Sequence, residues 1–326
     1  MKAVIIKSFG APDQLELGQW PDPIPGSKEV KVAVYATAIN RADTLQRMGS
    51  YPPPPGDSPI LGLEMAGEVV EVGEEVTRWK TGDRVFGLLG GGGYAEYATI
   101  HEDMAMSVPA GWSYAEAAAV PEVFLTAFQA IHWIAGLKKG ETILIHAGAS
   151  GVGTAAIQLA KCLEAGVIVT ASGPKHDLCL TLGADYAIDY KKEAFDEAVL
   201  KLSNGKGVSV IIDFLAAAYW NQNLRALGIE GRMVMLALMG GAKVEVTNLA
   251  SILVKRLRIE GSTLRARSLD YKIRLTQGFY SYTAPLFEEE KLKPVIDRIM
   301  PWTEVSEAHR YMEANKSRGK IVLKVR

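Results

Sequence analysis

The chain has 326 residues, of which 48% are hydrophobic and 22% are charged. This length and composition are typical of a globular protein that buries a sizeable core and divides into two domains. The formal net charge of −1 argues against nucleic acid or an anionic membrane as the main partner.

No apolar stretch is long enough to span a bilayer, and the first residues contain no signal-peptide core. The two cysteines, Cys162 and Cys179, have no metal-ligand spacing and indicate structural thiols in a reducing compartment. We therefore expect a cytoplasmic protein.

The N-terminal region, residues 1–122, has the composition of a β-rich domain. Its β-branched residues alternate or cluster at 2–7, 29–38 and 67–72, between proline and glycine punctuation. The proline run at 52–55 predicts a stiff loop, either a surface connector or the wall of a cleft. The glycines at 90–93 predict a loop that bends freely or approaches another group closely.

A glycine-rich turn is the most informative motif in the middle of the chain. Residues 142–147, Thr-Ile-Leu-Ile-His-Ala, predict a buried parallel strand. The sequence Gly151-Val-Gly153-Thr-Ala-Ala156 then fits the Gly-x-Gly-x-x-Gly/Ala pattern of dinucleotide-binding turns. Missing side chains at Gly151 and Gly153 would let a pyrophosphate approach the backbone at a helix N-terminus. The alternative interpretation is an ordinary small-residue turn between a strand and a helix.

The region from residue 121 onward alternates strands and helices. We expect strands at 142–147, 167–171, 186–189, 208–213, 232–238 and 257–261, with helices beginning near 152, 175, 193, 219 and 248. Such an alternation predicts a parallel, doubly wound sheet that binds a dinucleotide at its switch point. Helices at 268–282 and 305–314 and a strand at 320–325 should return to the first domain. The expected fold is therefore α/β, with a nucleotide-binding domain at 123–262 inserted between 1–122 and 263–326.

The residues after the second strand of this sheet indicate the cofactor. A site for NAD normally places Asp or Glu about 20 residues beyond the glycines, to hold the ribose 2′-hydroxyl. Here Ser172 could donate a hydrogen bond, Lys175 could supply positive charge for a 2′-phosphate, and Tyr190 could add a hydroxyl. We therefore expect NADPH, while a solvated Lys175 on the first turn of a helix is the alternative.

Five motifs resemble the medium-chain dehydrogenase/reductase superfamily, in its zinc-free quinone oxidoreductase branch. They occur in the family's order over nearly the whole chain: Asn40-Arg-Ala-Asp43 with Arg47, Gly49 and Tyr51; Gly62-Leu-Glu-Met-Ala-Gly67; Pro121-Glu-Val-Phe-Leu-Thr-Ala127; the glycine turn; and Asn315-Lys-Ser-Arg-Gly-Lys-Ile-Val-Leu323. Leu238-Met-Gly-Gly241 and Met312-Glu-Ala-Asn-Lys316 are most similar to the stress-inducible animal subgroup. The resemblance implies a GroES-like catalytic domain, an inserted Rossmann domain with a cleft between them, and homodimers or homotetramers. A β-rich stretch at 243–246 could pair across subunits or form a lone edge strand.

The zinc alcohol dehydrogenases of the same fold have Cys in the segment matching Asn40 and His in the segment matching Leu63. Here those segments offer an amide and an alkyl chain, and Glu64 alone cannot build a tetrahedral zinc site. We therefore expect no metal. Without that Lewis acid the acceptor must already be electrophilic, as quinones, enones and other conjugated carbonyls are.

The resemblance also implies the residues of the site. Asn40 would hydrogen-bond the substrate or nicotinamide, and Tyr51 would supply an aromatic edge and a hydroxyl; the alternatives are that Asn40 caps a turn and that Tyr51 packs on prolines. Asp43 and Arg47 are interpreted as a local structural ion pair, and Glu64 as a buried acceptor of backbone hydrogen bonds. The residues expected at the cofactor are Thr126, Gly148, Ser150, Gly151, Val152, Gly153, Ser172, Lys175, Tyr190, Met239, Gly240, Leu264 and Asn315.

One segment departs from the family pattern. Relatives carry paired glycines after the fourth strand of the nucleotide domain, where this chain has Ala216 and Ala217. Alanine disfavours positive φ, so we expect the loop to be altered and cofactor affinity to be reduced.

Three functions remain open from the sequence. The first is an NADPH:quinone oxidoreductase; the second is an NADPH-dependent reductase of enones or enoyl thioesters on the same scaffold. The third is a non-enzymatic relative that binds RNA or has a structural role, and the near-neutral charge argues against its RNA-binding form.

Overall fold

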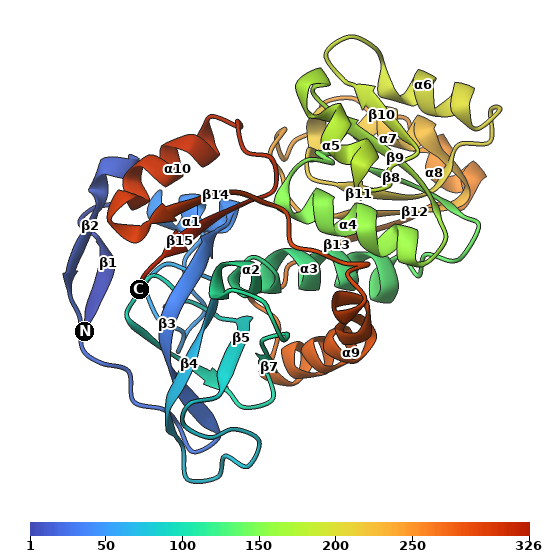
Figure 1. Cartoon of the computed structure of the whole chain (residues 1–326). Helices are drawn as coiled ribbons and strands as arrows, with labels where there is room; N and C mark the ends of the chain where they lie inside the picture. The colour runs from blue at the N-terminus through green and yellow to red at the C-terminus, as the bar shows by residue number, and fades with distance from the viewer. The chain divides into compact units, whose positions relative to one another are not determined.

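The computed structural model describes all 326 residues, and the chain divides into two compact units (Figure 1). Unit 1 comprises residues 1–125 and 264–326, and unit 2 comprises residues 126–263. The nucleotide-binding region is therefore an insertion within a domain built from both ends of the sequence. None of the helices combines the length and apolar composition that crossing a membrane requires.

Unit 2 is built on a six-stranded parallel sheet in the order β10-β9-β8-β11-β12-β13. Its strands are β8 (Thr142–Ile145), β9 (Gly166–Ala171), β10 (Tyr186–Asp189), β11 (Val208–Asp213), β12 (Leu227–Met235) and β13 (Arg258–Gly261). Numbered from β8, this order is 3-2-1-4-5-6, the doubly wound arrangement of Rossmann folds, so the expected fold class is confirmed. Its switch point lies between β8 and β11.

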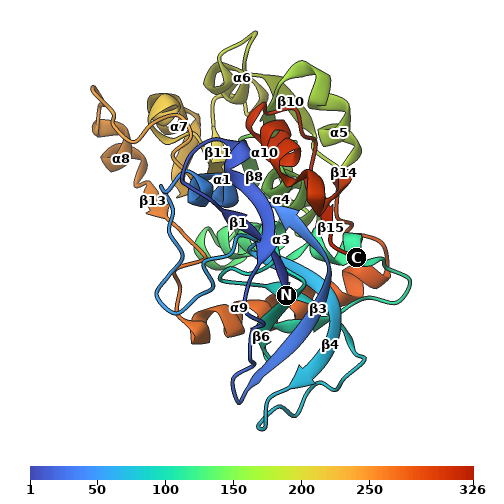
Figure 2. The ribbon, with the colours of Figure 1, turned by 90° about the vertical axis from the view of Figure 1, so that its left-hand side faces the viewer.

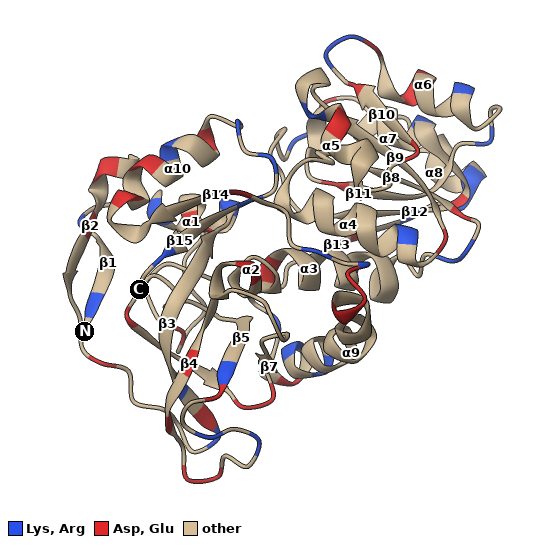
Figure 3. Cartoon of the chain, in the orientation of Figure 1, with Lys and Arg blue, Asp and Glu red and all other residues tan.

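The crossover helices of unit 2 are α4 (Gly151–Cys162), α5 (His176–Thr181), α6 (Phe195–Leu202), α7 (Trp220–Ala226) and α8 (Ala250–Lys255), with short 3₁₀ turns at Gly173–Lys175 and Ala216–Ala218 and a π-helical segment at Gln129–Ile134. Helix α4 shows why they pack on the sheet. Its residues 153–160 are buried, and its one charged residue, Lys161, lies near its C-terminal end. Figure 3 shows α4 mostly in tan, without acidic residues.

Two expectations for unit 2 need correction. Strand β12 begins at Leu227, five residues before the expected start at 232, and its register against β11 shifts between Val208 and Val210. Gly228 and Gly231 in this stretch obscure the β-strand pattern in the sequence. Residues 243–246 form no edge strand within the chain, and their pairing across subunits stays a prediction.

Unit 1 contains a sheet in the order β14-β15-β3-β4-β5-β7, with β6 also paired to β3, and a separate β1-β2 hairpin. Its strands are β1 (Lys2–Ile6), β2 (Leu15–Gln19), β3 (Glu29–Ile39), β4 (Glu64–Val72), β5 (Arg84–Leu88), β6 (Tyr97–His101), β7 (Ala105–Ser107), β14 (Ile296–Pro301) and β15 (Lys320–Lys324). Figure 2 shows β3 and β4 side by side as long curved strands.

The helices of unit 1 are α1 (Arg41–Arg47), α2 (Tyr114–Ala118), α9 (Leu269–Glu288) and α10 (Val305–Glu313), with 3₁₀ turns at Pro12–Gln14 and Trp302–Glu304; α3 (Pro121–Phe128) contains the boundary to unit 2. Strand β15 pairs antiparallel with β3, placing Ile321 opposite Ile39. The C-terminal segment therefore completes the sheet of the N-terminal domain, as the sequence predicts.

Candidate functional sites in the two units

The glycine turn of unit 2 presents an anion-binding surface. Strand β8 ends at Ile145, and α4 begins at Gly151 after Ser150, whose Oγ accepts a hydrogen bond of 3.1 Å from the N–H of Gly153. The N–H groups of Gly151 and Val152 have no hydrogen-bond partner within the chain. Two free donors at the positive end of a 12-residue helix suit a pyrophosphate.

The glycines at this turn are required by packing. A Cβ on Gly153 would lie 2.4 Å from the carbonyl oxygen of Ala147, and a Cβ on Gly148 would lie 2.7 Å from Cβ of Val169 on β9. Gly153 therefore lets α4 lie close against the turn. Its part in the approach of a pyrophosphate stays a prediction. The residue with positive φ in this turn is Ala147, at 49°.

The residues expected to select the cofactor lie at the carboxyl edge of the same sheet. Ala171 of β9 is in register with Asp189 of β10, so Ser172 and Tyr190 follow two neighbouring strand ends. Lys175 closes the 3₁₀ turn after Ser172, its N–H donating to the Ser172 carbonyl at 2.8 Å. Ser172, Lys175 and Tyr190 thus all follow strand ends at this edge of the sheet.

Sequence reasoning missed Asp189 at this edge. A Cβ on Gly173 would lie 2.9 Å from Oδ2 of Asp189, so the carboxylate lies directly beside the turn that holds Lys175. Its Oδ1 accepts from the N–H of Lys191 at 3.1 Å, and Lys192 Nζ lies 3.8 Å from Oδ2. The turn Gly173–Lys175 therefore carries a lysine and has the Asp189 carboxylate beside it.

The loop with the alanine departure adopts the backbone geometry that glycine favours. Ala216 has φ of 49°, is 4% exposed, and donates its N–H to Asp213 Oδ2 at 3.0 Å. The loop bonds to a second loop, because Met239 donates to the Phe214 carbonyl and Gly240 to the Leu215 carbonyl, each at 3.0 Å. Ala216 therefore holds a left-handed conformation that a Cβ disfavours, and the expected loss of cofactor affinity stays a prediction.

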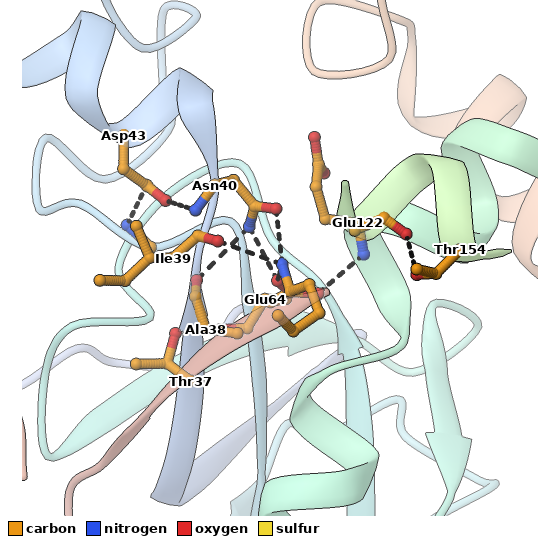
Figure 4. Close-up of polar contacts among 11 residues, drawn as sticks. Thr37, Ala38, Ile39, Asn40, Asp43, Glu64, Glu122 and Thr154 are labelled. Atoms are coloured by element: carbon orange, nitrogen blue, oxygen red, sulfur yellow. Dashed lines mark hydrogen bonds and ion pairs between the residues drawn. The ribbon is translucent and has the colours of Figure 1, made fainter. Parts of the chain in front are cut away.

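Unit 1 contains a buried ionic cluster that includes Asn40 (Figure 4). Lys320 Nζ donates to Glu64 Oε1 and to Asn40 Oδ1, both at 2.7 Å, and Asn40 Nδ2 also donates to Glu64 Oε1 at 2.7 Å. Glu64 Oε2 accepts from the backbone N–H of Glu122 at 2.8 Å. Glu64 is therefore a buried acceptor of a backbone hydrogen bond, as expected, and also the anion of a closed network.

The expected ion pair between Asp43 and Arg47 is wrong. Asp43 accepts backbone hydrogen bonds from Asn40 at 2.7 Å and Gly62 at 3.0 Å, and burial raises its pKa to about 6. Arg47 instead pairs with Glu313 and contacts His309 Nδ1 at 3.2 Å, both on α10. Asp43 and Arg47 both lie on α1, yet their side chains reach different neighbours, which spacing in the sequence cannot show.

The Asn40 cluster does not fit a zinc ion. Its one carboxylate is bound by an ammonium group, and Leu63 contributes only a buried alkyl chain. Nowhere in the chain do three or more His, Cys, Asp or Glu side chains form a group that could hold a metal.

Tyr51 lies beside a buried arginine that the sequence analysis did not identify. The guanidinium carbon of Arg265 lies 5.5 Å from the centroid of the Tyr51 ring, and its Nε donates to the Gly90 carbonyl at 2.8 Å. Glu122 contributes to the local field: its side chain points away from Glu64 (Figure 4), and burial, followed by the nearby Glu64 charge, raises its pKa to about 8. The Tyr51 ring thus lies beside a buried cation.

The other residues expected at the cofactor lie in different places. Thr126 is in the π-continued helix α3, Met239 is exposed, and Leu264 is buried in unit 1. Asn315, with φ of 55°, accepts a hydrogen bond of 2.7 Å from Arg41 through its Oδ1.

Two family models match the chain. Residues 26–110 match the alcohol dehydrogenase GroES-like domain, and residues 151–277 match the zinc-binding dehydrogenase family. Among curated proteins, the synaptic vesicle membrane protein VAT-1 homolog of Rattus norvegicus is 30% identical over 339 residues, covering 99% of this chain and 84% of the relative. The phenolphthiocerol synthesis polyketide synthase Pks15/1 of Mycobacterium bovis is 43% identical over 208 residues, 63% of this chain. The chain spans only 10% of that relative's length.

Solved structures with the same fold cover nearly the whole chain. An NAD-dependent alcohol dehydrogenase has a TM-score of 0.89 at 32% identity, with each chain covered completely. The quinone oxidoreductase of Pseudomonas syringae has a TM-score of 0.87 at 30% identity, covering 99% of both chains. The CurK enoyl reductase has 0.88 at 29%, covering 99% of this chain and 98% of its own, and a mycobacterial protein in complex with NADPH has 0.87 at 29%, covering both chains completely.

Proposed function

The chain belongs to the quinone oxidoreductase branch of the medium-chain dehydrogenase/reductase superfamily, and on this basis we propose that it is an NADPH-dependent, zinc-independent reductase of quinones. Bound NADPH supplies a hydride to an acceptor that is already electrophilic. The protein's contribution is to bind and orient the two reactants and to exclude competing reactions.

The observation that carries this proposal is the Asn40–Glu64–Lys320 cluster. A metal-dependent relative would need Lewis-acid ligands in these segments, but here the Glu64 carboxylate is neutralised by Lys320 Nζ at 2.7 Å. An unactivated alcohol or ketone would lack polarisation in such a site, whereas a conjugated carbonyl does not need it. The cluster therefore favours an activated acceptor.

The cofactor proposal rests on unit 2. The free N–H groups of Gly151 and Val152 would hold the pyrophosphate, and Ser172, Lys175 and Tyr190 would hold the 2′-phosphate of NADPH. A related structure contains NADPH, while another relative is NAD-dependent, so the choice depends on these residues.

For Asn40 and Tyr51 we propose supporting roles at the acceptor. Asn40 is held by Lys320 and Glu64, which fixes the orientation of its amide. Tyr51 has its ring beside the Arg265 guanidinium and its backbone carbonyl accepting from Arg265 Nη1 at 3.4 Å. Neighbouring residues thus hold both side chains in position.

The decisive experiment is an acceptor panel run on the purified protein. Initial rates of NADPH oxidation would be measured with an ortho-quinone, a para-quinone, an alkenal, an enoyl thioester and a simple ketone. We expect turnover of the quinones, none of the simple ketone, and no zinc by elemental analysis. Stoichiometric zinc, or turnover of the simple ketone alone, would contradict the proposal.

A second candidate is an NADPH-dependent reductase of enones or enoyl thioesters. It is favoured by the CurK enoyl reductase likeness and by the 43% identity to a polyketide synthase segment. An enoyl thioester rate well above the quinone rates in the same panel would select it. The expected homodimer or homotetramer stays a prediction, which light scattering after gel filtration would test.

A further inference from the structure

Arg265 is a buried cation whose hydrogen-bonding capacity is incompletely used. It is 5% exposed, its Nε donates to the Gly90 carbonyl at 2.8 Å, and its Nη1 reaches the Tyr51 carbonyl at 3.4 Å. Its Nη2, a fully buried nitrogen with two N–H donors, has no partner. The guanidinium is therefore fixed on two backbone carbonyls, with one terminal nitrogen left unpaired.

No carboxylate compensates this charge directly. Asp43, Asp57, Tyr51 and Glu122 each influence the guanidinium electrostatically, yet none forms an ion pair with it, and burial lowers the pKa of Arg265. A buried cation with an unpaired donor costs several kcal/mol in free energy (~2–5) unless another group accepts from it. The absence of such a group within unit 1 points to a ligand.

We propose that Nη2 of Arg265 binds the carbonyl oxygen of the acceptor and stabilises the negative charge that this oxygen gains. The inference rests on the proposed reductase function. Bound NADPH would supply a hydride to the conjugated system of the acceptor, which would form one new bond to hydrogen, place an electron pair on the carbonyl oxygen and oxidise the nicotinamide. The oxygen then takes a proton from solvent.

The surroundings of Arg265 suit this role. The centroid of the Tyr51 ring lies 5.5 Å from the guanidinium carbon, so an aromatic group lies directly beside the cation. A preorganised donor aimed at a developing oxyanion is worth roughly 10²–10³ in rate in other enzymes. Arg265 would thus provide the oxygen-binding function that a Lewis acid provides in metal-dependent relatives.

The test measures binding of an oxyanion mimic without any cofactor. 4-Nitrophenolate carries its charge on an oxygen attached to a flat conjugated ring, and its absorbance reports the ionised form. Wild-type protein should bind it and lower its apparent pKa. Arg265→Met should weaken binding about tenfold or more, whereas affinity for nitrobenzene, which has no phenolate oxygen, should change less than twofold.

The control is Arg326→Met, which removes an exposed arginine that also lies over a tyrosine ring, 5.0 Å from the Tyr97 centroid. This variant should bind 4-nitrophenolate as the wild type does. If Arg265→Met fails to fold, Arg265→Lys keeps the charge without the planar fork and should still reduce affinity. Thermal unfolding checks each variant.

Kinetics give a second readout. Arg265→Met should lower kcat/KM for quinones about 10²-fold while leaving the Kd for NADPH, measured by fluorescence, within twofold. Equal binding of 4-nitrophenolate by wild type and Arg265→Met would overturn the proposal, because Nη2 would then take no part in binding the oxyanion. If the protein bound 4-nitrophenolate but oxidised NADPH with none of the acceptors, the reductase function would be overturned and the oxyanion site would still be supported.

Discussion

The ammonium group of Lys320 lies 2.7 Å from the carboxylate of Glu64, and the two side chains are 3% and 0% exposed. The two residues lie on β15 and β4, which both neighbour β3 in the sheet. Two opposite charges buried this deeply stabilise the fold only as a pair, because either charge alone would be left uncompensated in a low-dielectric interior.

The first prediction concerns this pair. Lys320→Met should lower the free energy of unfolding by about 3–5 kcal/mol, since Glu64 would remain buried and uncompensated. Lys320→Met combined with Glu64→Gln should recover much of that loss. Urea unfolding of the two single variants and the double variant measures the coupling, and strictly additive losses would show that the residues act independently.

The second prediction concerns Glu122, whose pKa is raised from its ordinary 4.5 to about 8. The folded state keeps this carboxyl protonated where the unfolded chain ionises it. Stability from this group is therefore fully present below pH 4.5 and is lost as the pH rises through 8, by at most about 1.4 kcal/mol per pH unit.

Glu122→Gln should consequently gain stability over the wild type as the pH rises from 5 to 8. Urea unfolding at several pH values measures the difference. The exposed Glu74→Gln variant serves as the matched control and should show a constant difference. A flat profile for Glu122→Gln would contradict the assignment.

The third prediction concerns Ala216, which has a φ of 49°. Left-handed backbone costs a residue with a Cβ about 1–2 kcal/mol, and glycine loses about 0.5–1 kcal/mol through chain entropy. Ala216→Gly should therefore raise the free energy of unfolding of unit 2 by roughly 0.5–1 kcal/mol. It should also tighten NADPH binding if the loop touches the cofactor.

Ala217→Gly is the matched control for that prediction, because Ala217 has no positive φ. It should lose about 0.5–1 kcal/mol of stability. Differential scanning fluorimetry ranks the two variants, and an equal loss in both would show that Ala216 carries no strain.

The fourth prediction concerns cofactor choice. Lys175→Glu should raise the KM for NADPH roughly 10- to 100-fold, since a hydrogen bond to a charged phosphate contributes about 1.5–3 kcal/mol. The KM for NADH should change far less. Asp189→Asn is a companion variant that should shift the preference toward NADPH by removing negative charge near the same turn. If Lys175→Glu changed the KM for NADPH and for NADH equally, Lys175 would not be a 2′-phosphate ligand.

The sequence predicted the parallel sheet well because its strands are buried runs bounded by glycines and short loops. The strands at 186–189 and 208–213 match the structure to the residue, and the helix at the glycine turn begins one residue before the expected position. Strand β12 was misjudged because its two glycines interrupt the pattern of side chains, while its hydrogen bonds to β11 do not depend on that pattern.

The candidate site was predicted less completely. Asn40 and Glu64 were identified, but their partner Lys320 lies 256 residues beyond Glu64, and no local pattern connects them. Arg47 was paired with its helix neighbour Asp43 because spacing favoured it, whereas α10 supplies the actual partner. Arg265 carried no sequence signal, since an arginine before a helix is ordinarily solvated and only tertiary packing buries it.

Strand β15 gives unit 1 a particular dependence on synthesis order. The lysine that neutralises Glu64 emerges from the ribosome after the whole inserted unit, so until Lys320 has been synthesised a nascent chain must bury Glu64 without its partner or keep that region open. Unit 2 has no such requirement, because all six strands of its sheet come from one continuous stretch of sequence. Unit 2 can therefore fold first, whereas the two sequence segments of unit 1 can pair only after the second segment has been synthesised.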